Sequence, residues 1–180
     1  MQFPLPSHPF QAQRRRLLLA LPIASISGGV WAATPEALAP GQSAPDFDLP
    51  GQNDRRTRLS DLAGKVVYLD FWASWCGPCR QSFPWMNALH ADWRQRGLHI
   101  LAVNVDARRA DAMRFLADNP PTFALAFDAA GATPRAYGVR AMPTSFIIDR
   151  KGVIAAVHAG FTESRGAAMR REIETILGAG

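Results

Sequence analysis

The two cysteines of this chain, Cys76 and Cys79, are the residues best suited to chemistry. Only Gly77 and Pro78 separate them, so the two thiols could form a disulfide with each other, supply half of a metal site, or exchange electrons with a disulfide on another molecule. A disulfide across so short a loop removes little entropy from the unfolded chain, which disfavours a purely structural role. The spacing therefore favours a reactive pair.

The segments on either side of the pair indicate where it lies. Residues 65–71 form a nearly continuous apolar run, which is typical of a strand buried on both faces. After the cysteines, apolar side chains recur at helical spacing, and Gly97 is expected to end this helix. The inward-facing stripe of the predicted helix consists of Phe83, Met86, Leu89 and Trp93.

Cys76 then stands where the predicted strand ends and the predicted helix begins. Unpaired backbone N–H groups and the helix dipole stabilise a thiolate at such a point, so we expect Cys76 to be the nucleophile. Cys79 lies one helical turn further on and suits a resolving thiol that attacks the mixed disulfide. Gly77 allows a close approach, and Pro78 donates no N–H and restricts the loop.

Asp70 belongs to the same apolar strand. Because its neighbours are apolar, we expect its carboxyl group to be buried behind the cysteines, where the loss of water raises its pKa. A carboxylate in that position could accept the proton of Cys79, through a water molecule. Asp70 is therefore a candidate proton acceptor, and an aspartate that points to solvent at the strand end is the alternative.

Other uses of the thiols are less consistent with the sequence. A structural zinc site usually needs four ligands, and His90, His99 and His158 each stand alone, so we expect no metal site. A thiol peroxidase would carry proline and threonine where Leu69 and Ala73 stand. A copper carrier remains an alternative, although such proteins usually have one more residue between their cysteines.

Strand and helix patterns alternate along the rest of the chain. A short hairpin is expected from residues 46–49 and 56–59, followed by a helical turn at 60–62. Further strands are expected at 98–105, 122–127, 144–149 and 153–159, and further helices at 109–118 and from Thr162, with Met169, Ile173, Ile176 and Leu177 facing inward. This order predicts an α/β fold with a mixed central β-sheet flanked by helices.

Composition is consistent with one folded domain and gives no sign of nucleic-acid binding. The chain has 180 residues, of which 48% are hydrophobic and 19% charged, enough for one core. Its net charge of +5 includes Arg14, Arg15 and Arg16; without them, 17 basic and 15 acidic residues leave +2. The remaining charges are mixed along the chain, as on a solvated surface.

The first 32 residues are typical of an export signal. Arg14, Arg15 and Arg16 precede an apolar stretch over residues 17–26, and Val30 and Ala32 fit a cleavage site after Ala32. The run QRRRLL resembles a twin-arginine signal. The apolar stretch is short for a bilayer span, and the protein would contact a membrane only if this leader stayed uncleaved. We expect a linker at residues 33–43 and the folded domain at 44–180.

A family resemblance follows from these motifs. Residues 68–80, which include WASWCGPCR, resemble the active-site segment of thioredoxin. Residues 44–47 and 59–65 are similar to the entry of exported thioredoxin-like proteins of the TlpA and ResA kind. The resemblance spans residues 44–177 and implies the thioredoxin fold with an N-terminal β-hairpin extension.

The resemblance also implies a substrate-binding loop. It makes Pro143 a cis-proline beside the disulfide, with Met142 offering its backbone to an incoming peptide and Thr144 next to it. The implied active-site loop comprises Trp75, Gly77 and Pro78. Ala102 stands where thioredoxin carries a lysine.

The implied activity is that of a thiol:disulfide oxidoreductase, with no cofactor beyond the Cys76–Cys79 redox-active disulfide. The Gly-Pro pair resembles reducing members of the family, so we expect a periplasmic reductant of protein disulfides that a membrane thiol reductase recharges. The implied targets are apocytochrome c thiols or oxidised copper-site cysteines. A disulfide-forming oxidase or isomerase is the competing enzyme function, and a copper-carrying module is the competing binding function.

Overall fold

The computed structural model describes residue 2 and residues 37–52 and 55–179. The predicted export signal lies outside these residues apart from Gln2, and so do residues 33–36 of the predicted linker and residues 53 and 54 of the predicted hairpin turn. Among the described residues, no helix combines the length and the apolar character needed to cross a bilayer.

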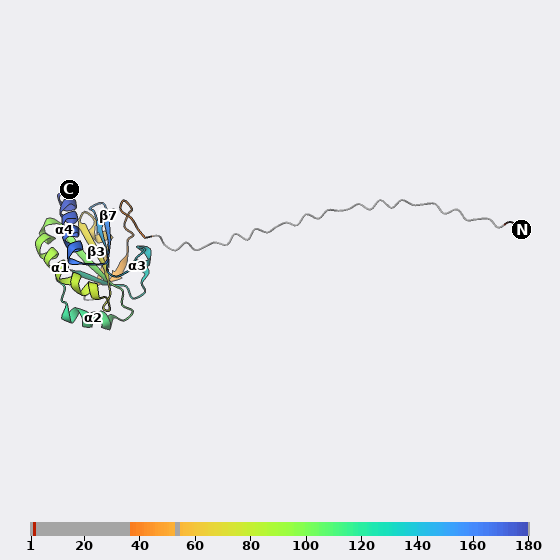
Figure 1. Ribbon diagram of the computed structural model, residues 1–180, viewed down its shortest axis with the longest axis horizontal. Coiled ribbons are helices and arrows are strands. Elements are labelled where there is room, and N and C mark those ends of the chain that lie inside the picture. The colour runs from red at the N-terminus through yellow and green to blue at the C-terminus, as the bar shows by residue number, and fades with distance from the viewer. Residues whose placement is uncertain (1, 3–36, 53–54, 180) are drawn as a thin grey trace. The chain divides into compact units, whose positions relative to one another are not determined.

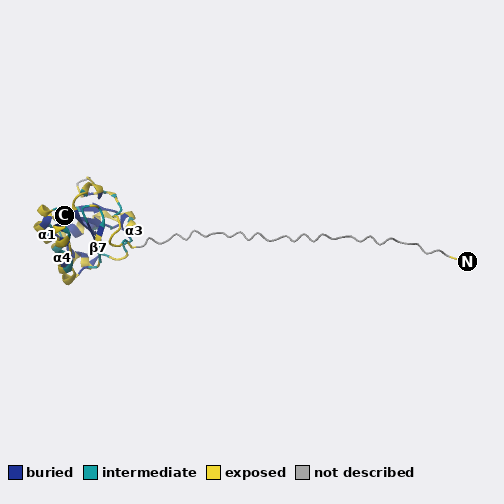
Figure 2. Ribbon diagram, turned by 90° about the horizontal axis from the view of Figure 1, so that it is seen from above, coloured by how far each residue is buried: buried dark blue, intermediate teal, exposed yellow. Residues whose placement is uncertain are grey.

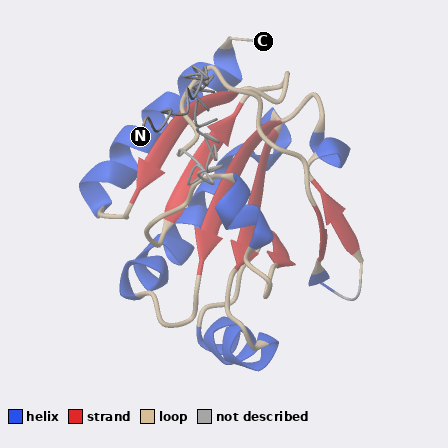
Figure 3. Ribbon diagram, turned by 90° about the vertical axis from the view of Figure 1, so that its right-hand side faces the viewer, coloured by secondary structure: helices blue, strands red, loops and turns tan. Residues whose placement is uncertain are grey.

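A five-stranded sheet is the centre of the domain (Figures 1 and 3). Its strands lie in the order β5-β4-β3-β6-β7. Their bounds are Val66–Trp72 for β3, Leu98–Asn104 for β4, Ala124–Phe127 for β5, Thr144–Ile148 for β6 and Ile154–Ala159 for β7. Strands β3, β4 and β5 are parallel, whereas β6 runs antiparallel to β3 and β7 antiparallel to β6. The sheet is mixed, as the order of elements predicts.

Strand β3 divides the core into two layers because its side chains alternate between the two faces of the sheet. All seven of its residues are buried. Val66, Tyr68 and Trp72 pack into one apolar cluster with both cysteines, and Val67, Leu69 and Phe71 pack into the other. This burial on both faces explains why residues 65–71 form a nearly continuous apolar run, because a central strand that is covered on both sides has no face open to water.

Helices cover the face that carries the cysteines. Helix α1 (Gly77–Trp93) contributes the stripe expected from the sequence, and α4 (Glu163–Gly178) and α2 (Arg109–Asp118) add apolar side chains to the same cluster. The outer surfaces of α1 and α4 are exposed, whereas the strands between the layers are buried (Figure 2). Gly97, in the left-handed conformation at φ 91°, follows the short 3-10 helix η3 (Arg94–Arg96), which continues α1.

The described residues between 37 and 62, at the start of the domain, pack against the opposite face of the sheet and reach both of its edges. Strands β1 (Asp48–Pro50) and β2 (Arg56–Arg58) form the expected antiparallel hairpin, and the 3-10 helix η2 (Ser60–Leu62) follows it. Ser43 bridges to Val153 beside β7, and Gly51 bridges to Ala126 of β5. These contacts reduce the open length of each edge strand, where unpaired backbone groups promote aggregation.

Two parts of the fold differ from the sequence-based expectation. Helix α3 (Ala132–Ala136) is absent from it, because five residues that include Pro134 give no helical period. Residues 37–43, expected to be linker, contact the domain: Leu38 packs into the second apolar cluster, and the Gly41 N–H donates to the Ile154 carbonyl at 2.8 Å. The Pro- and Gly-rich composition gave no sign of these contacts, because they are made to a strand more than a hundred residues later.

Replacing one buried and one exposed methionine by alanine should show how much core packing on α1 contributes to the stability of the fold. Met86 of α1 is 0% exposed, and Met113 of α2 is 51% exposed. Met86→Ala leaves a cavity in the cysteine-side cluster and is expected to lower the free energy of unfolding by about 2–5 kcal/mol in denaturant titration. Met113→Ala is the matched control, with an expected change within about 0.5 kcal/mol. Equal losses for both variants would contradict the assigned packing of α1.

Candidate active site

Cys76 and Cys79 form a disulfide at the N-terminus of α1. Cys76 is the N-cap residue, with extended backbone angles, and its sulfur accepts the Cys79 N–H at 3.2 Å. Cys79 lies in the first turn and is 0% exposed, whereas Cys76 is 4% exposed. The N–H donor and the aligned peptide dipoles both favour negative charge on the Cys76 sulfur once the disulfide is reduced.

The loop around the disulfide presents its other residues to solvent. Trp75 is 71% exposed, the largest value among the large hydrophobic side chains of the described residues. Gly77 and Pro78 are exposed, and Pro78 lies in the first turn of α1 as expected. A Cβ atom at Gly77 would meet no atom within 4 Å, so the fold itself does not require glycine there. Any close approach at Gly77 would have to come from another molecule.

Asp70 is buried, as its apolar neighbours predict, and its side chain leaves β3 on the same face as Tyr68 and Trp72, which pack in the cluster that contains both cysteines. Asp70 is 1% exposed, and its Oδ2 has no hydrogen-bond partner. Burial raises its pKa well above the ordinary value. The residues paired with it on the adjacent strands are Ala102 of β4 and Ser145 of β6, so neither neighbour in the sheet brings a positive charge.

Two buried hydroxyl groups lie on the same face of the sheet as Asp70. The Tyr68 hydroxyl and the Ser145 hydroxyl both contact the Met169 sulfur at 3.8 Å. Burial, and then the charge of Asp70, raise the pKa of Tyr68 well above its ordinary value. Sequence reasoning missed Ser145; its place two residues after Pro143, opposite Asp70, becomes visible only with the register of β6 against β3.

The Met142–Pro143 peptide bond is cis, as the family resemblance implies. Thr144 pairs with Phe71, so Pro143 lies at the carboxyl end of β3, the end from which the cysteine loop departs. Met142 packs against the apolar cluster that contains both cysteines. The Pro143 carbonyl accepts the Gly160 N–H at 2.7 Å, which ties this loop to the end of β7.

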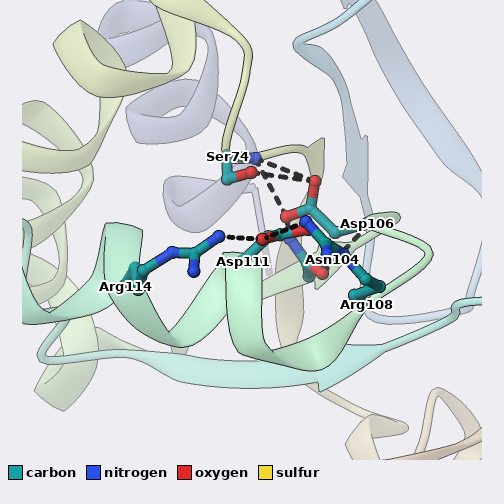
Figure 4. A network of polar contacts seen from close by, with 6 residues as sticks. All are labelled: Ser74, Asn104, Asp106, Arg108, Asp111 and Arg114. Carbon is teal, nitrogen blue, oxygen red and sulfur yellow. Dashed lines mark hydrogen bonds and ion pairs between the residues drawn. The ribbon is translucent and has the colours of Figure 1, made fainter.

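A second group of polar residues, which sequence reasoning also missed, holds the loop before Cys76 (Figure 4). The Asp106 carboxylate accepts the Ser74 N–H and the Ser74 hydroxyl at 3.0 Å, and the Asn104 amide at 2.8 Å. Asp106 follows β4, which is parallel to β3, and the carboxyl ends of parallel strands lie at one edge of a sheet. That rule applied to Asn104 and Asp106 could have predicted the group.

Two of the described histidines, His90 and His158, each contact one polar side chain. The His90 Nδ1 lies 3.1 Å from the Thr122 hydroxyl, and the His158 Nε2 lies 2.8 Å from Glu172 Oε2. Burial, with the nearby charge of Lys65, lowers the pKa of His99 to about 4. Among residues 37–52 and 55–179, no three His, Cys, Asp or Glu side chains cluster as metal ligands would.

Comparison with known proteins agrees with this geometry. Residues 39–177 match the sequence model of the Redoxin family. The chain is 36% identical over 149 residues to the thiol-disulfide oxidoreductase ResA of Geobacillus thermodenitrificans, covering 81% of this chain and 86% of the relative, and 36% identical to ResA of Bacillus subtilis, covering 72% and 73%. A crystal structure of a putative thiol:disulfide interchange protein DsbE from Chlorobium tepidum superposes with a TM-score of 0.76 at 53% identity, covering 78% of this chain and 99% of that one.

The buried carboxyl group gives a pH-dependent prediction. Because the pKa of Asp70 is higher in the folded state than its ordinary 3.8, the folded state binds more protons, and stability falls as the pH rises from about 4 through the folded pKa. Asp70→Asn should therefore raise the free energy of unfolding at pH 7, because the amide does not ionise, and should raise it by less near pH 4, where the carboxyl group is protonated in the folded state.

Asp46 provides a control of opposite sign. Burial raises its pKa, but hydrogen bonds from Ser60 and Phe47 outweigh burial and leave the pKa lowered. Its contribution is present above the ordinary value of 3.8 and is lost as the pH falls through the folded pKa. Asp46→Asn should thus destabilise the protein at pH 7, as measured by urea unfolding across pH. Destabilisation at pH 7 by Asp70→Asn as well would contradict the burial of Asp70.

Proposed function

This chain belongs to the Redoxin family and is a thioredoxin-like thiol-disulfide oxidoreductase, and we propose that it works in the periplasm as a reductant of disulfides in exported proteins. The observation that carries the proposed exchange chemistry, in either direction, is the Cys76 sulfur at the N-terminus of α1, within 3.2 Å of the Cys79 N–H. That position favours a thiolate, which is the nucleophile in thiol–disulfide exchange.

The proposed reaction has two exchange steps. The Cys76 thiolate attacks one sulfur of a substrate disulfide, a mixed disulfide forms, and the other substrate sulfur leaves as a thiolate. Cys79 then loses its proton and attacks the Cys76 sulfur, which closes the Cys76–Cys79 disulfide and releases the second substrate thiol. Two electrons pass from the enzyme to the substrate, and no further cofactor takes part.

Asp70 is the proposed proton acceptor for Cys79. Cys79 is inaccessible to solvent, so its proton needs an acceptor inside the protein. The Asp70 side chain leaves β3 on the same face as Tyr68 and Trp72, which pack in the cluster that contains both cysteines. Burial raises the pKa of Asp70 well above the ordinary value, which makes its carboxylate a stronger proton acceptor than an ordinary one. We propose that a water molecule connects the two groups.

The surface around the disulfide is the proposed binding site for substrate protein. Trp75 offers an exposed aromatic side chain, and Met142, Pro143 and Thr144 lie at the same end of the sheet. An extended substrate segment would pair with the backbone of Met142, as an added strand does in other complexes.

The direction of electron flow is inferred from the Gly-Pro pair and from the family. A reductant in the periplasm needs a source of electrons, because that compartment is kept oxidising, and a membrane thiol reductase is the proposed donor. The proposed targets are the disulfide that the haem-binding cysteines of apocytochrome c form when oxidised, or oxidised copper-site cysteines. The predicted signal of residues 1–32 supports export, with a tether to the membrane if it stays uncleaved.

The redox potential tests the direction. Equilibration with glutathione, read out by the ratio of reduced to oxidised Cys76–Cys79, should give a midpoint closer to that of thioredoxin, about −270 mV, than to that of the oxidant DsbA, about −120 mV. A midpoint near the second value would favour the disulfide-forming oxidase. Sub-picomolar binding of Cu(I) by the reduced protein, together with negligible insulin reduction, would favour the copper carrier.

Trapping assigns the roles of the two cysteines. Cys79→Ser removes the resolving thiol, so the mixed disulfide on Cys76 should persist and be visible as a covalent complex with a model disulfide protein on non-reducing gels. Cys76→Ser is the matched control and should trap nothing. A complex that forms with Cys76→Ser and not with Cys79→Ser would reverse the assignment.

A further inference from the structure

Asp106 lies outside the cysteine motif and carries a buried carboxylate. Its two oxygens accept hydrogen bonds from Ser74, in the loop before Cys76, and from Asn104, the last residue of β4. Asp106 is 6% exposed. Its Oδ2 accepts the Ser74 N–H at 3.0 Å and the Asn104 amide at 2.8 Å, and its Oδ1 accepts the Ser74 hydroxyl at 3.0 Å. Figure 4 shows Ser74 above the end of β4, with both of its donors directed at Asp106.

Ser74 lies inside the turn that delivers Cys76 to the helix. The Cys76 N–H donates to the Ala73 carbonyl at 3.1 Å, so Ser74 and Trp75 are the two central residues of a four-residue turn. The Val105 N–H donates to the Trp72 carbonyl at 3.0 Å, just before the turn. The turn is thus fastened to the end of β4 by a backbone bond at its base and by Asp106 at its first central residue.

We propose that Asp106 is a positioning residue for Cys76: by holding both donors of Ser74, it fixes the turn that keeps the Cys76 sulfur against the Cys79 N–H. The inference rests on the proposed role of Cys76 as the nucleophile. A free turn would let the Cys76 side chain leave the helix N-terminus, and the stabilisation of the thiolate falls off within one helical turn. The reactivity of Cys76 would then approach that of an ordinary cysteine.

The other charged side chains that line the surface hollow beside Ser74 are Arg80, Asp111, Arg114 and Asp118, and within the part of the chain that the structure describes none of them is hydrogen-bonded to the turn. Asp111 pairs with Arg108 at 2.8 Å and also with Arg114, and all three belong to α2 or its N-cap. Both arginines are well exposed, so these pairs contribute little fixed geometry. Arg80 lies over the Phe115 ring at 5.2 Å. Among the described residues, Asp106 is the carboxylate that accepts hydrogen bonds from the turn itself.

The proposal depends on the hydrogen bonds that Asp106 accepts more than on its negative charge. Two substitutions at position 106 can separate the effect of the hydrogen bonds from the effect of the charge. An asparagine at 106 can place its oxygen at the Oδ2 position, where it accepts the Ser74 N–H and the Asn104 amide. Its NH₂ group then faces the Ser74 hydroxyl, which can accept as well as donate. Asp106→Asn therefore preserves these three contacts without the charge and loses only the longer one, in which the Ser74 N–H also lies 3.3 Å from Oδ1, whereas Asp106→Ala removes all of them.

The test measures alkylation of Cys76 by iodoacetamide against pH in the reduced full-length protein, with the alkylated cysteine identified by mass spectrometry. Asp106→Ala is expected to slow the reaction at pH 7 by roughly three- to tenfold and to move its pH midpoint upward, because the thiolate loses its fixed donor. Asp106→Asn should react within about twofold of the wild type.

Asp149→Ala is the matched control. Asp149 Oδ1 also accepts two backbone N–H groups, those of Lys151 and Val153 at 2.9 Å, but in the turn at the other end of β6. It should lower thermal stability and leave the alkylation profile unchanged. If Asp106→Ala lowers stability as Asp149→Ala does but keeps the wild-type profile, Asp106 is only structural and the proposal is wrong.

Ser74 supplies a second pair of variants that keeps the test decisive if Asp106→Ala does not fold. Ser74→Ala removes the hydroxyl donor and should slow alkylation by roughly twofold or more, and Ser74→Thr keeps the donor and should restore the wild-type rate. Equal profiles for both would overturn the proposal. A wild-type Cys76 that itself alkylates like free cysteine would instead overturn the proposed function, so the two failures are distinguishable.

Discussion

The interaction on which the site depends is the placement of one sulfur at the first turn of one helix. The Cys76 sulfur accepts the Cys79 N–H, and no side chain in that contact supplies a positive charge. The stabilisation comes from the backbone, through an N–H group that the helix leaves unpaired and through aligned peptide dipoles. Contacts that fix the positions of β3, the turn at Ser74 and Trp75, and α1 relative to one another therefore affect the reactivity of Cys76.

The two cysteines differ because the fold gives them different surroundings. Cys76 lies at the N-cap and is 4% exposed, whereas Cys79 lies in the first turn of α1 and is 0% exposed, within the apolar cluster on the face of β3 that also carries Asp70. Burial lowers the acidity of Asp70, and no cation on the adjacent strands offsets it. One helix terminus and one buried carboxyl group thus give two chemically identical thiols separate roles in the proposed reaction.

Much of this arrangement could be predicted from local sequence. The apolar run of β3 and the stripe of α1 have the periods of a buried strand and a covered helix, and they place the cysteines between them. Helix α3 could not be predicted, because a helix of five residues shows no period. The link between Ser74 and Asp106 depends on the pairing of β3 with β4, and the position of Ser145 opposite Asp70 depends on the register of β6 against β3. Contacts of this kind join residues from separate strands, so they become visible only with the topology.

The most direct test of the central claim is a pH titration of the thiolate in the fully reduced protein, followed by its ultraviolet absorbance. A thiolate should form well below pH 8.5, about where free cysteine titrates, and this transition should be lost in Cys76→Ser and retained in Cys79→Ser. A transition at the free-cysteine value, or a low-pH transition that survives in Cys76→Ser, would contradict the account.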